Sequence, residues 1–482
     1  MLTLADLFEC FTNTRPAGTE RIEISSVVVD SRQVKPGSLF IAMQGETRDG
    51  HTFIPDARAR GAAAILAETR AGVGEGLGPN THLYNPKNAS VAGLQPGPSP
   101  LAPAVFLANS SLVALQQLAK FWRRKFAMCQ MIGVTGSVGK SSTKELIAAV
   151  LRQRYNTLRN EGNLNNEIGL PLTLLQLNET HERAVLEMGM YGLGEIKTLC
   201  DIAQPRIGVV TNVGPVHLER LGSIENIARA KAELVEALPR DGVAILNGDD
   251  ARVIAMKAKT QARVFCYGLN PDCDVWADAV ESFGLEGIAF VLHRGDEELR
   301  VRVPLLGRHS VNTSLAAASV GLVEGLTWDE ILRGLQDVSA QLRLIVIPAE
   351  NGATILDDAY NASPASTLAA LNLMAEMSER KIAVLGDMLE LGAEEQSGHQ
   401  IVGGRAAQVV DVLIAVGARG KLIGEAARDT GMVSEQVLFA DNNLQAIEIL
   451  RKVMRAGDMV LVKGSRGARM EEIVSALTQE KI

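Results

Sequence analysis

Apolar residues in this chain gather into short runs bounded by turn residues, and the runs alternate with segments of helical periodicity. After about Phe106 the runs cover residues 129–136, 184–190, 207–214 and 242–250, and helical patterns cover residues 110–126 and 142–155. Such alternation is typical of buried parallel strands with helices on both faces of the sheet. The pattern therefore predicts an α/β fold.

The alternation starts again after Arg343, with apolar runs at residues 353–360, 381–388, 412–418 and 458–465. This predicts a Rossmann-like domain, although no GxGxxG fingerprint accompanies it. Near the N-terminus, residues 23–32 and 38–45 are strand candidates, and residues 71–100 are rich enough in Gly, Pro, Asn and Ser to predict a long surface loop or linker. We expect three domains: a small mixed α/β domain at 1–105, a central parallel-sheet domain at 106–342 and a C-terminal Rossmann-like domain at 343–482.

The composition is that of a globular protein, since 46% of the 482 residues are hydrophobic and 22% are charged. A formal net charge of -8 argues against a nucleic-acid partner, which usually leaves a basic footprint. No apolar run reaches the roughly 18 residues of a membrane-spanning helix, and the N-terminus lacks the pattern of a signal peptide. We therefore expect a cytoplasmic protein with no membrane partner, and a monomer.

The cysteines and one basic run receive structural interpretations. Only one pair of cysteines is close in sequence, and its spacing fits neither a zinc knuckle nor a redox CxxC site, so we expect reduced, structural thiols. The cysteines are Cys10, Cys129, Cys200, Cys266 and Cys273. The basic run at residues 123–125 ends a helical pattern, where cations complement the helix dipole.

A lysine interrupts the apolar stripe of the helical segment at residues 224–238. Lys231 falls between Ile227 and Leu234 on that stripe, while acidic residues and Arg229 occupy the opposite face. One interpretation is that the stem packs against the core while the ammonium reaches water. The other is that Lys231 has a chemical function at the buried side of the helix.

The segment GVTGSVGKSSTKE, which begins at Gly133, follows an apolar run and opens a helical one. Its glycines can turn successive N–H groups inward, its lysine supplies a positive charge, and its serine offers a hydroxyl to a metal. The spacing is GxxGKS rather than GxxxxGK[ST], and an ordinary glycine turn is the alternative, but the strand–loop–helix context favours a nucleotide polyphosphate. The expected nucleotide-binding residues are Thr135, Gly136, Ser137, Val138, Gly139, Lys140, Ser141 and Ser142. The central domain is then predicted to be a P-loop ATPase domain.

A nucleotide site also needs magnesium, which prefers hard ligands and keeps water and phosphate in its octahedron. Glu187 ends one apolar run and His217 follows another. Ligands of open parallel sheets bind at the carboxyl ends of the strands, so both residues become candidate metal ligands together with Ser141. The alternatives are a solvated strand-end carboxylate and a loop histidine with ordinary partners.

Lys231 lies on the helix that follows His217, so the turn can bring it to the same strand ends. Burial and a nearby magnesium ion would both lower its pKa and favour the neutral amine. A neutral amine can capture carbon dioxide as a carbamate, which is an anionic oxygen ligand suited to magnesium.

Eight motifs in order closely resemble those of the Mur ligases. They are VTGSVGKSSTKE, EGNLNNEIGLPLTLL, LEMGMYGLGEI, TNVGPVHLERLGSIENIARAKAEL, LNGDD, GRHSVNTSLAAA, LDDAYNASP and LGDMLELG. The N-terminal segment VVDSRQVKPGSLFIAMQGETRDGHTF is similar to the part of these enzymes that holds a UDP-sugar. The resemblance covers nearly the whole chain, and the stretch GNLNNEIGLPLTLL is most similar to the family member that adds a dipeptide.

The resemblance implies an ATP-dependent amide ligase of peptidoglycan precursor synthesis. Its substrates would be UDP-N-acetylmuramoyl-tripeptide and D-Ala-D-Ala. ATP would phosphorylate the peptide carboxylate, and the incoming amine would attack the acyl phosphate, releasing ADP and phosphate. Two magnesium ions are implied, with Lys140 and the metal offsetting charge on the transferred phosphoryl group.

The resemblance also implies roles for single residues. Ser141 and Glu187 match ligands of one magnesium ion, and His217 and carbamoylated Lys231 match ligands of the second; Lys140, His217 and Lys231 are the expected catalytic residues. Arg343 and Asp358 match positions where the C-terminal domain closes on the nucleotide. The substrate-binding positions are Asp30, Ser31, Arg32, Asp49, His51, Asn163 and Asn166.

The chain departs from the family pattern at two places. The family usually has an asparagine directly after the histidine of GRH and another three residues later, but here Ser310 and Thr313 stand there and Asn312 is one place off. Leu342 replaces the glycine that commonly precedes the domain-junction arginine. The alternatives are therefore a sister ligase that adds an amino acid, folylpolyglutamate synthase, which the N-terminal DSR and DGH motifs disfavour, and a catalytically idle nucleotide-binding paralogue.

Overall fold

The computed structural model describes residues 1–45, 48–68, 83–84, 103–337 and 344–478. These residues form two compact units. The first comprises residues 1–131, 156–188 and 197–205, and the second comprises residues 132–155, 189–196 and 206–482. The predicted linker at 71–100 lies outside the described residues apart from Leu83–Tyr84.

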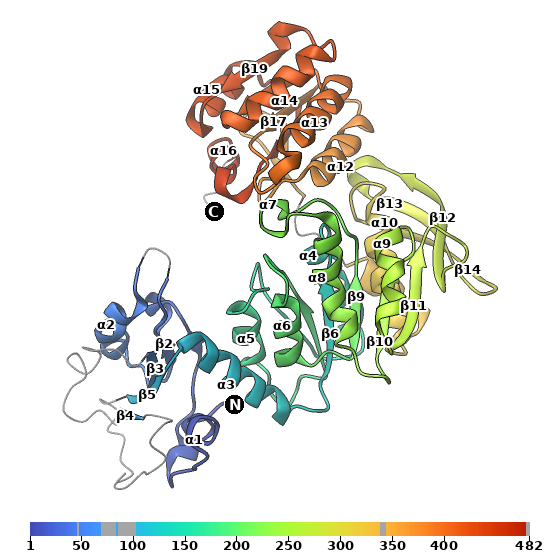
Figure 1. Cartoon of the computed structure of the whole chain (residues 1–482). Coiled ribbons are helices and arrows are strands. Elements are labelled where there is room, and N and C mark those ends of the chain that lie inside the picture. The colour runs from blue at the N-terminus through green and yellow to red at the C-terminus, as the bar shows by residue number, and fades with distance from the viewer. Residues whose placement is uncertain (46–47, 69–82, 85–102, 338–343, 479–482) are drawn as a thin grey trace. The chain divides into compact units, whose positions relative to one another are not determined.

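The N-terminal sheet has the order β1-β2-β3-β5-β4, and all its printed pairs are parallel. Its strands are β1 (Val27–Val28), β2 (Leu39–Ile41), β3 (Ala64–Glu68), β4 (Leu83–Tyr84) and β5 (Ala104–Ala108). Side chains such as Phe40, Ile65 and Val105 form the core of this sheet. Figure 1 shows α2 beside β2 and β3.

The central sheet has the order β14-β13-β12-β11-β10-β9-β6-β8-β7. Its strands are β6 (Gln130–Thr135), β7 (Thr157–Arg159), β8 (Arg183–Glu187), β9 (Ile207–Val210), β10 (Val243–Asn247), β11 (Arg263–Gly268), β12 (Val275–Ser282), β13 (Ile288–Arg294) and β14 (Glu297–Val303). The predicted parallel pairing is confirmed for β6, β9, β10 and β11. The antiparallel extension β12–β14 was not predicted, although the alternating segment that forms β14 is a period-2 pattern.

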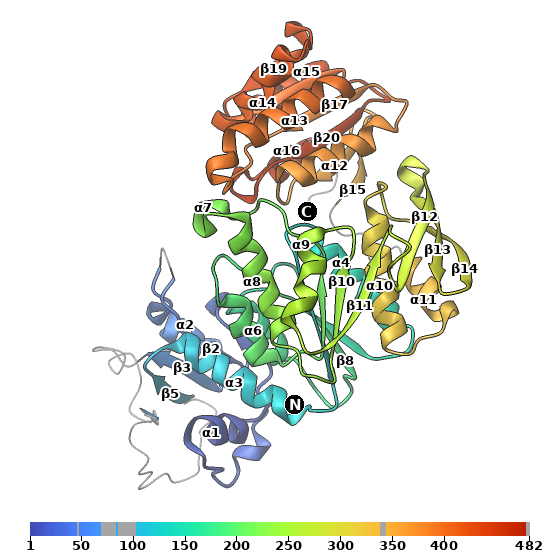
Figure 2. The same cartoon turned by 45° about the vertical axis from the view of Figure 1, so that its right-hand side comes forward.

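The C-terminal sheet has the order β15-β16-β20-β17-β18-β19. Its strands are β15 (Ile345–Pro348), β16 (Thr354–Asp358), β17 (Lys381–Leu385), β18 (Val412–Val416), β19 (Val437–Ala440) and β20 (Met459–Lys463). All neighbours are parallel except β15 and β16. Two separate cores cover the faces, one built with α12, α13 and α14 and the other with α15 and α16 (Figure 2). This confirms the predicted Rossmann-like layering.

The helices connect and cover these strands. They are α1 (Leu4–Thr12), α2 (Ile54–Ala59), α3 (Ser111–Lys125), α4 (Lys140–Leu151), α5 (Gly169–Leu174), α6 (Glu195–Ala203), α7 (Leu218–Leu221), α8 (Ile224–Glu236), α9 (Ala251–Ile254), α10 (Ser310–Val323), α11 (Trp328–Leu335), α12 (Pro364–Ala375), α13 (Glu395–Val409), α14 (Gly417–Asp429), α15 (Asn443–Val453) and α16 (Glu471–Ser475). Several begin at a capping residue; Ser223, for example, accepts a hydrogen bond from the backbone N–H of Asn226 and starts α8.

The basic run at the end of α3 has the structural role that the sequence predicted. Arg123 is buried and donates to the backbone oxygen of Ala203 at 2.9 Å, and Lys125 pairs with Asp6 at 2.6 Å. Asp6 also forms the capping box of α1 with Thr3. These contacts join α1 and α3 within the first unit.

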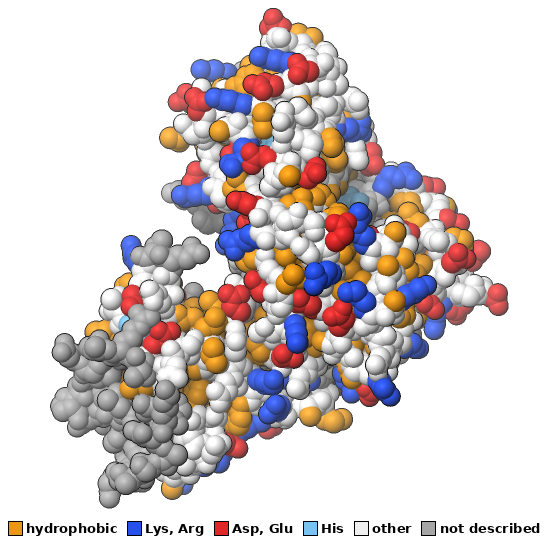
Figure 3. Space-filling view, viewed as in Figure 1, with side chains coloured by type: hydrophobic (Ala, Val, Ile, Leu, Met, Phe, Trp, Pro, Cys, Tyr) orange, Lys and Arg blue, Asp and Glu red, His pale blue; other side chains and the backbone are white. Residues whose placement is uncertain are grey.

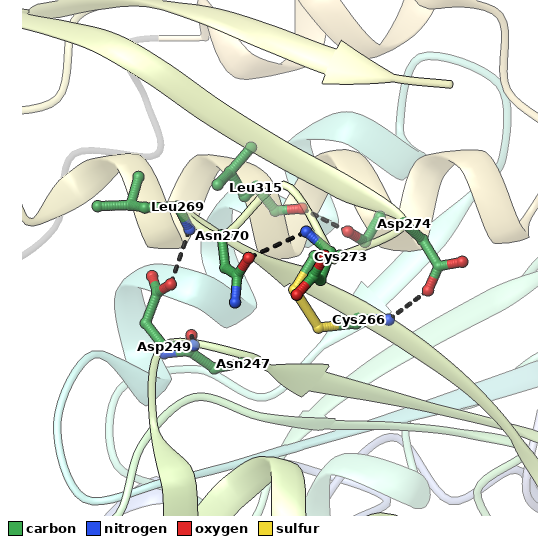
Figure 4. The surroundings of a disulfide bond; sticks show 10 residues. Asn247, Asp249, Cys266, Leu269, Asn270, Cys273, Asp274 and Leu315 are labelled. Atoms are coloured by element: carbon green, nitrogen blue, oxygen red, sulfur yellow. Dashed lines mark hydrogen bonds between the residues drawn. A yellow bond between two sulfur atoms is a disulfide. The ribbon is translucent and has the colours of Figure 1, made fainter. Parts of the chain in front are cut away.

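The expectation that all cysteines are reduced was wrong for one pair. Cys266 on β11 and Cys273 in the following turn form a disulfide, and their Cα atoms lie 4.8 Å apart (Figure 4). The turn returns the chain because Asn270 accepts from the N–H of Cys273 and Asp274 accepts from the N–H of Cys266. Spacing in the sequence did not reveal that these turn contacts bring the two sulfur atoms together.

The surface mixes both signs of charge. Acidic and basic side chains are interspersed over the described residues on the face that Figure 3 shows. Within the described part of the chain, no helix combines the length and the apolar character that crossing a membrane requires.

Candidate active site

The glycine-rich segment forms the predicted strand–loop–helix unit. The loop leaves β6 at Thr135 and enters α4 at Lys140, and Gly139 at the N-cap of α4 has φ 81°. This left-handed backbone conformation favours glycine. The first backbone N–H groups of α4 lack partners within the helix, so the loop lies where a helix provides its most favourable anion site.

A second segment braces the phosphate loop. Asn212, which follows β9, accepts from the N–H of Val138 at 2.8 Å, and Ser137 donates its hydroxyl to the backbone oxygen of Gly214 at 3.0 Å. The approach is close at Gly136, because a Cβ there would lie 1.8 Å from Oγ1 of Thr211. Gly136 is therefore required by packing as well as by conformation.

Lys140 lies at the first position of α4 and points back into the loop. Its Nζ donates to the backbone oxygens of Gly136 at 2.8 Å and Ser137 at 3.1 Å. Ser141, the predicted metal ligand beside it, is buried, and Ser142 is half-buried. An ammonium held by loop carbonyls beside a helix N-terminus can meet a polyphosphate with little rearrangement.

Lys231 lies on the buried side of α8, as the apolar stripe predicted. It is only 2% exposed, so the alternative in which its ammonium reaches water was wrong. Burial, reinforced by the charge of Lys140, holds the pKa of Lys231 well below its usual range. The neutral amine is therefore favoured at this position.

His217 precedes α7 and shares this environment. Its pKa is lowered by burial and by the charges of Lys140 and Lys231, against an opposing effect from Glu390. Nδ1 of His217 is hydrogen-bonded to the carboxylate of Glu390, and the ring of Tyr191 packs edge-on with its centroid 5.1 Å away. Glu390 and Tyr191 were not predicted, since their positions in sequence give no indication that they reach His217.

Glu187 belongs to the first compact unit, whereas Lys140, Ser141, His217 and Lys231 belong to the second. Glu187 ends β8 and is 1% exposed. Its carboxylate accepts from Nδ2 of Asn165 at 2.7 Å, and its backbone N–H donates to Oδ1 of Asn160 at 2.9 Å. This buried environment excludes the alternative of a solvated carboxylate.

The two asparagines predicted to face the substrate have different surroundings. Asn163 is exposed. Asn166 is half-buried, and its Oδ1 accepts from the N–H of Gly169 at 2.8 Å at the start of α5. Asn165, which sequence reasoning passed over, is the member of this loop that contacts Glu187.

The N-terminal candidates form two local pairs. Asp30 holds Arg32 through Nε at 3.0 Å and Nη2 at 2.6 Å, while the Arg32 side chain remains 83% exposed. Asp49 contacts Nδ1 of His51 at 2.6 Å, and Nε2 of His51 accepts from the N–H of Glu68 at 2.9 Å. Ser31, the remaining candidate, is buried.

In the C-terminal sheet, Asp358 ends β16 and pairs with a lysine at the end of the neighbouring strand. Nζ of Lys463 contacts Asp358 and donates to the backbone oxygen of Asn361 at 2.9 Å. Lys463 is 2% exposed, and its charge, together with burial, lowers the pKa of His309. Arg343 and Leu342 lie outside the described residues.

The altered GRHSVNT segment starts α10. The hydroxyl of Ser310 donates to the backbone oxygen of Leu306 at 2.7 Å, and Thr313 is half-buried. Oδ1 of Asn312 is a buried side-chain oxygen for which the described residues supply no hydrogen-bond partner. Unpartnered buried oxygens are rare, so Asn312 has the capacity for a ligand contact that Ser310 has spent on the backbone.

Family comparison covers both units. Residues 23–91 match the catalytic domain of the Mur ligase family, residues 134–321 match the Mur ligase middle domain, and residues 342–466 match the Mur ligase glutamate ligase domain. The UDP-N-acetylmuramoyl-tripeptide--D-alanyl-D-alanine ligase of Bacillus subtilis (strain 168) is 35% identical over 467 residues, which cover 96% of this chain and 95% of that protein. The chain belongs to the Mur ligase family.

Solved structures agree with this Mur ligase along its whole length. Crystal structure I of MurF from Acinetobacter baumannii has a TM-score of 0.82 and 27% identity, and the similarity covers 99% of both chains. MurF from Thermotoga maritima in complex with ADP has a TM-score of 0.75 and 26% identity, covering 94% of this chain and 96% of that one. The Mur ligase described here therefore has the same three-part α/β architecture.

Proposed function

We propose that this chain is the ATP-dependent ligase that joins D-Ala-D-Ala to the stem-peptide carboxylate of UDP-N-acetylmuramoyl-tripeptide. The observation that carries the proposal is full-length similarity to a ligase of that activity at 35% identity. The braced phosphate loop supports it, because Lys140 and the start of α4 are placed to receive a polyphosphate. Domain boundaries at 105/106 and 342/343, a cytoplasmic location and a monomeric state belong to the same proposal.

The chemistry of the donor set fits magnesium. Ser141, Glu187 and His217 offer a hydroxyl, a carboxylate and an imidazole, and magnesium in nucleotide sites takes few protein ligands beside water and phosphate. Consistent with this, the described residues contain no preassembled group of three or more His, Cys, Asp or Glu for a metal. When bound, magnesium supplies positive charge that offsets the charge on the transferring phosphoryl group.

Lys231 is proposed to act as a carbamate. Its neutral amine attacks carbon dioxide, a nitrogen–carbon bond forms and one proton leaves, so a buried potential cation becomes an anionic oxygen ligand. The support is that Lys231 is buried and its pKa is lowered, while Lys140 supplies a neighbouring positive charge. An anion at this position would relieve the repulsion between the two lysines.

The remaining residues are proposed to bind the substrates. The exposed guanidinium of Arg32, oriented by Asp30, is suited to the diphosphate of a UDP-sugar, and Ser31, Asp49 and His51 lie in the same N-terminal domain. Asn163 and Asn166 are proposed to face the peptide. Asp358, held by Lys463, is proposed to contact the nucleotide together with Arg343.

The test is phosphate release from ATP with magnesium and UDP-N-acetylmuramoyl-tripeptide, comparing D-Ala-D-Ala with single amino acids. We expect release only with the dipeptide. Release with an amino acid instead would assign the chain to a sister ligase activity. Absence of release with every acceptor would favour an idle nucleotide-binding paralogue.

A further inference from the structure

Two turns from different sheets meet at His217. The first follows β9 and places His217 directly before α7. The second follows β17 of the C-terminal sheet and places Glu390 before the short helix η7 (Gly392–Glu394). Both turns and both sheet regions belong to the second compact unit.

Both contacting residues have an unusual backbone. His217 has φ 54° and Glu390 has φ 64°, in the left-handed region that residues other than glycine rarely adopt. Such conformations persist where the surrounding structure determines them, and they are frequent at functional sites. Two of them facing each other indicate that this contact constrains both turns.

Gly392 fits the second turn against the first. It has φ 53°, and a Cβ at this position would lie 3.0 Å from the backbone nitrogen of Glu219 in α7. The backbones of the two turns therefore pack closely next to the His217–Glu390 contact. Close backbone packing gives the carboxylate a defined position relative to the imidazole.

The contact selects one tautomer of the histidine. Glu390 is bonded to Nδ1, and a carboxylate can only accept, so Nδ1 carries the proton. The nearby charges of Lys140 and Lys231 disfavour a second proton on the ring. In the neutral ring Nε2 then holds a free lone pair, which is the form that binds metals.

We propose that Glu390 is a positioning residue that fixes the tautomer and orientation of His217 so that Nε2 binds magnesium. Histidine ligands commonly donate their other N–H to a carboxylate, and loss of that partner weakens metal binding about 10- to 100-fold. Because Glu390 belongs to the C-terminal sheet, this sheet contributes to the metal site through His217. The inference rests on the proposed role of His217 as a metal ligand.

The experiment measures Mn²⁺ binding to the full chain with ADP, by electron paramagnetic resonance, for Glu390→Ala and Glu390→Gln. Glutamine keeps an oxygen that accepts from Nδ1. We expect Glu390→Ala to weaken Mn²⁺ binding at least about tenfold and Glu390→Gln to stay within about threefold of the unchanged protein. Glu394→Ala is the matched control, since Glu394 is exposed and its carboxylate accepts from Ser397.

A second readout separates positioning from general loss of structure. Nitrogen NMR of His217 should show the proton on Nδ1 in the unchanged protein and in Glu390→Gln, and on Nε2 in a large share of Glu390→Ala molecules. Unchanged Mn²⁺ affinity in Glu390→Ala, or weakened affinity with an unchanged tautomer, would overturn the inference. Dipeptide-dependent phosphate release tests the proposed function independently, so a negative result for Glu390→Ala in an active ligase overturns this inference alone.

Discussion

Two buried lysines in this chain have opposite electrostatic environments. Lys463 is paired with Asp358, which offsets the cost of burying both charges. Lys231 has no carboxylate partner in the described part of the chain, and its pKa is lowered by burial. The same residue type is therefore a structural cation at one site and a potential nucleophile at the other.

Lys231→Ala is expected to lower turnover at least about 100-fold, a loss comparable to removing one group that stabilises transition-state charge. Steady-state phosphate release measures it. Bicarbonate should not restore turnover because the amine is gone, whereas acetate should restore part of it by supplying a carboxylate. Lys257→Ala, at an exposed position, is the control. Near-normal turnover of Lys231→Ala would contradict the carbamate.

Lys463→Met is expected to lower the free energy of unfolding by about 3–5 kcal/mol, because it leaves the Asp358 carboxylate without its buried partner. Lys421→Met is the control, since Lys421 is 46% exposed and its pair with Asp441 should contribute about 0–1 kcal/mol. Urea unfolding followed by circular dichroism compares the two. Equal effects would show that the buried pair adds nothing to stability.

Among the elements, the phosphate loop depends on its neighbour in the sheet. The segment after β9 provides the amide of Asn212, the hydroxyl of Thr211 and the backbone of Gly214, all in contact with the loop. The loop conformation is therefore determined by two strands together. This explains how a GxxGKS sequence shorter than the usual spacing can still form an ordered anion site.

Gly136→Ala should weaken ADP binding at least about tenfold, since the added methyl would meet Oγ1 of Thr211 and displace the loop from the phosphates. Isothermal titration calorimetry with ADP and magnesium measures the change. Gly194→Ala is the control: Gly194 also has a positive φ of 87°, but an added Cβ there meets nothing within 4 Å. ADP affinity within twofold of the unchanged protein would argue against a packing role for Gly136.

Across the whole molecule, the predicted nucleotide contacts come from different sheets. Lys140 follows β6 of the central sheet, and Asp358 ends β16 of the C-terminal sheet. A ligand bound by both favours conformations in which these sheets approach each other. The close packing of Gly392 against Glu219 shows one place where turns from these sheets already meet.

Small-angle scattering should therefore record a smaller radius of gyration when a non-hydrolysable ATP analogue, magnesium and UDP-N-acetylmuramoyl-tripeptide are added. ADP alone serves as the comparison, because it lacks the γ-phosphate and the peptide substrate. Identical compactness in all conditions would count against closure on the substrates.

Much of the fold was predictable because it depends on local pattern. Short apolar runs separated by helical periodicity predicted the parallel strands, and the stripe around Ile227 and Leu234 predicted the buried face of α8, including Lys231. The disulfide between Cys266 and Cys273 was missed because it depends on the turn that Asn270 and Asp274 stabilise.

The order of apolar runs, glycines and charged residues was enough to determine the α/β class, the phosphate loop and the candidate ligands, since these depend on residues close in sequence. Contacts over long separations needed the folded chain. His217 meets Glu390 and Asp358 meets Lys463 across more than a hundred positions, because parallel sheets place the ends of distant strands side by side. Backbone packing chose those partners, and no local pattern encodes which carboxylate faces which cation.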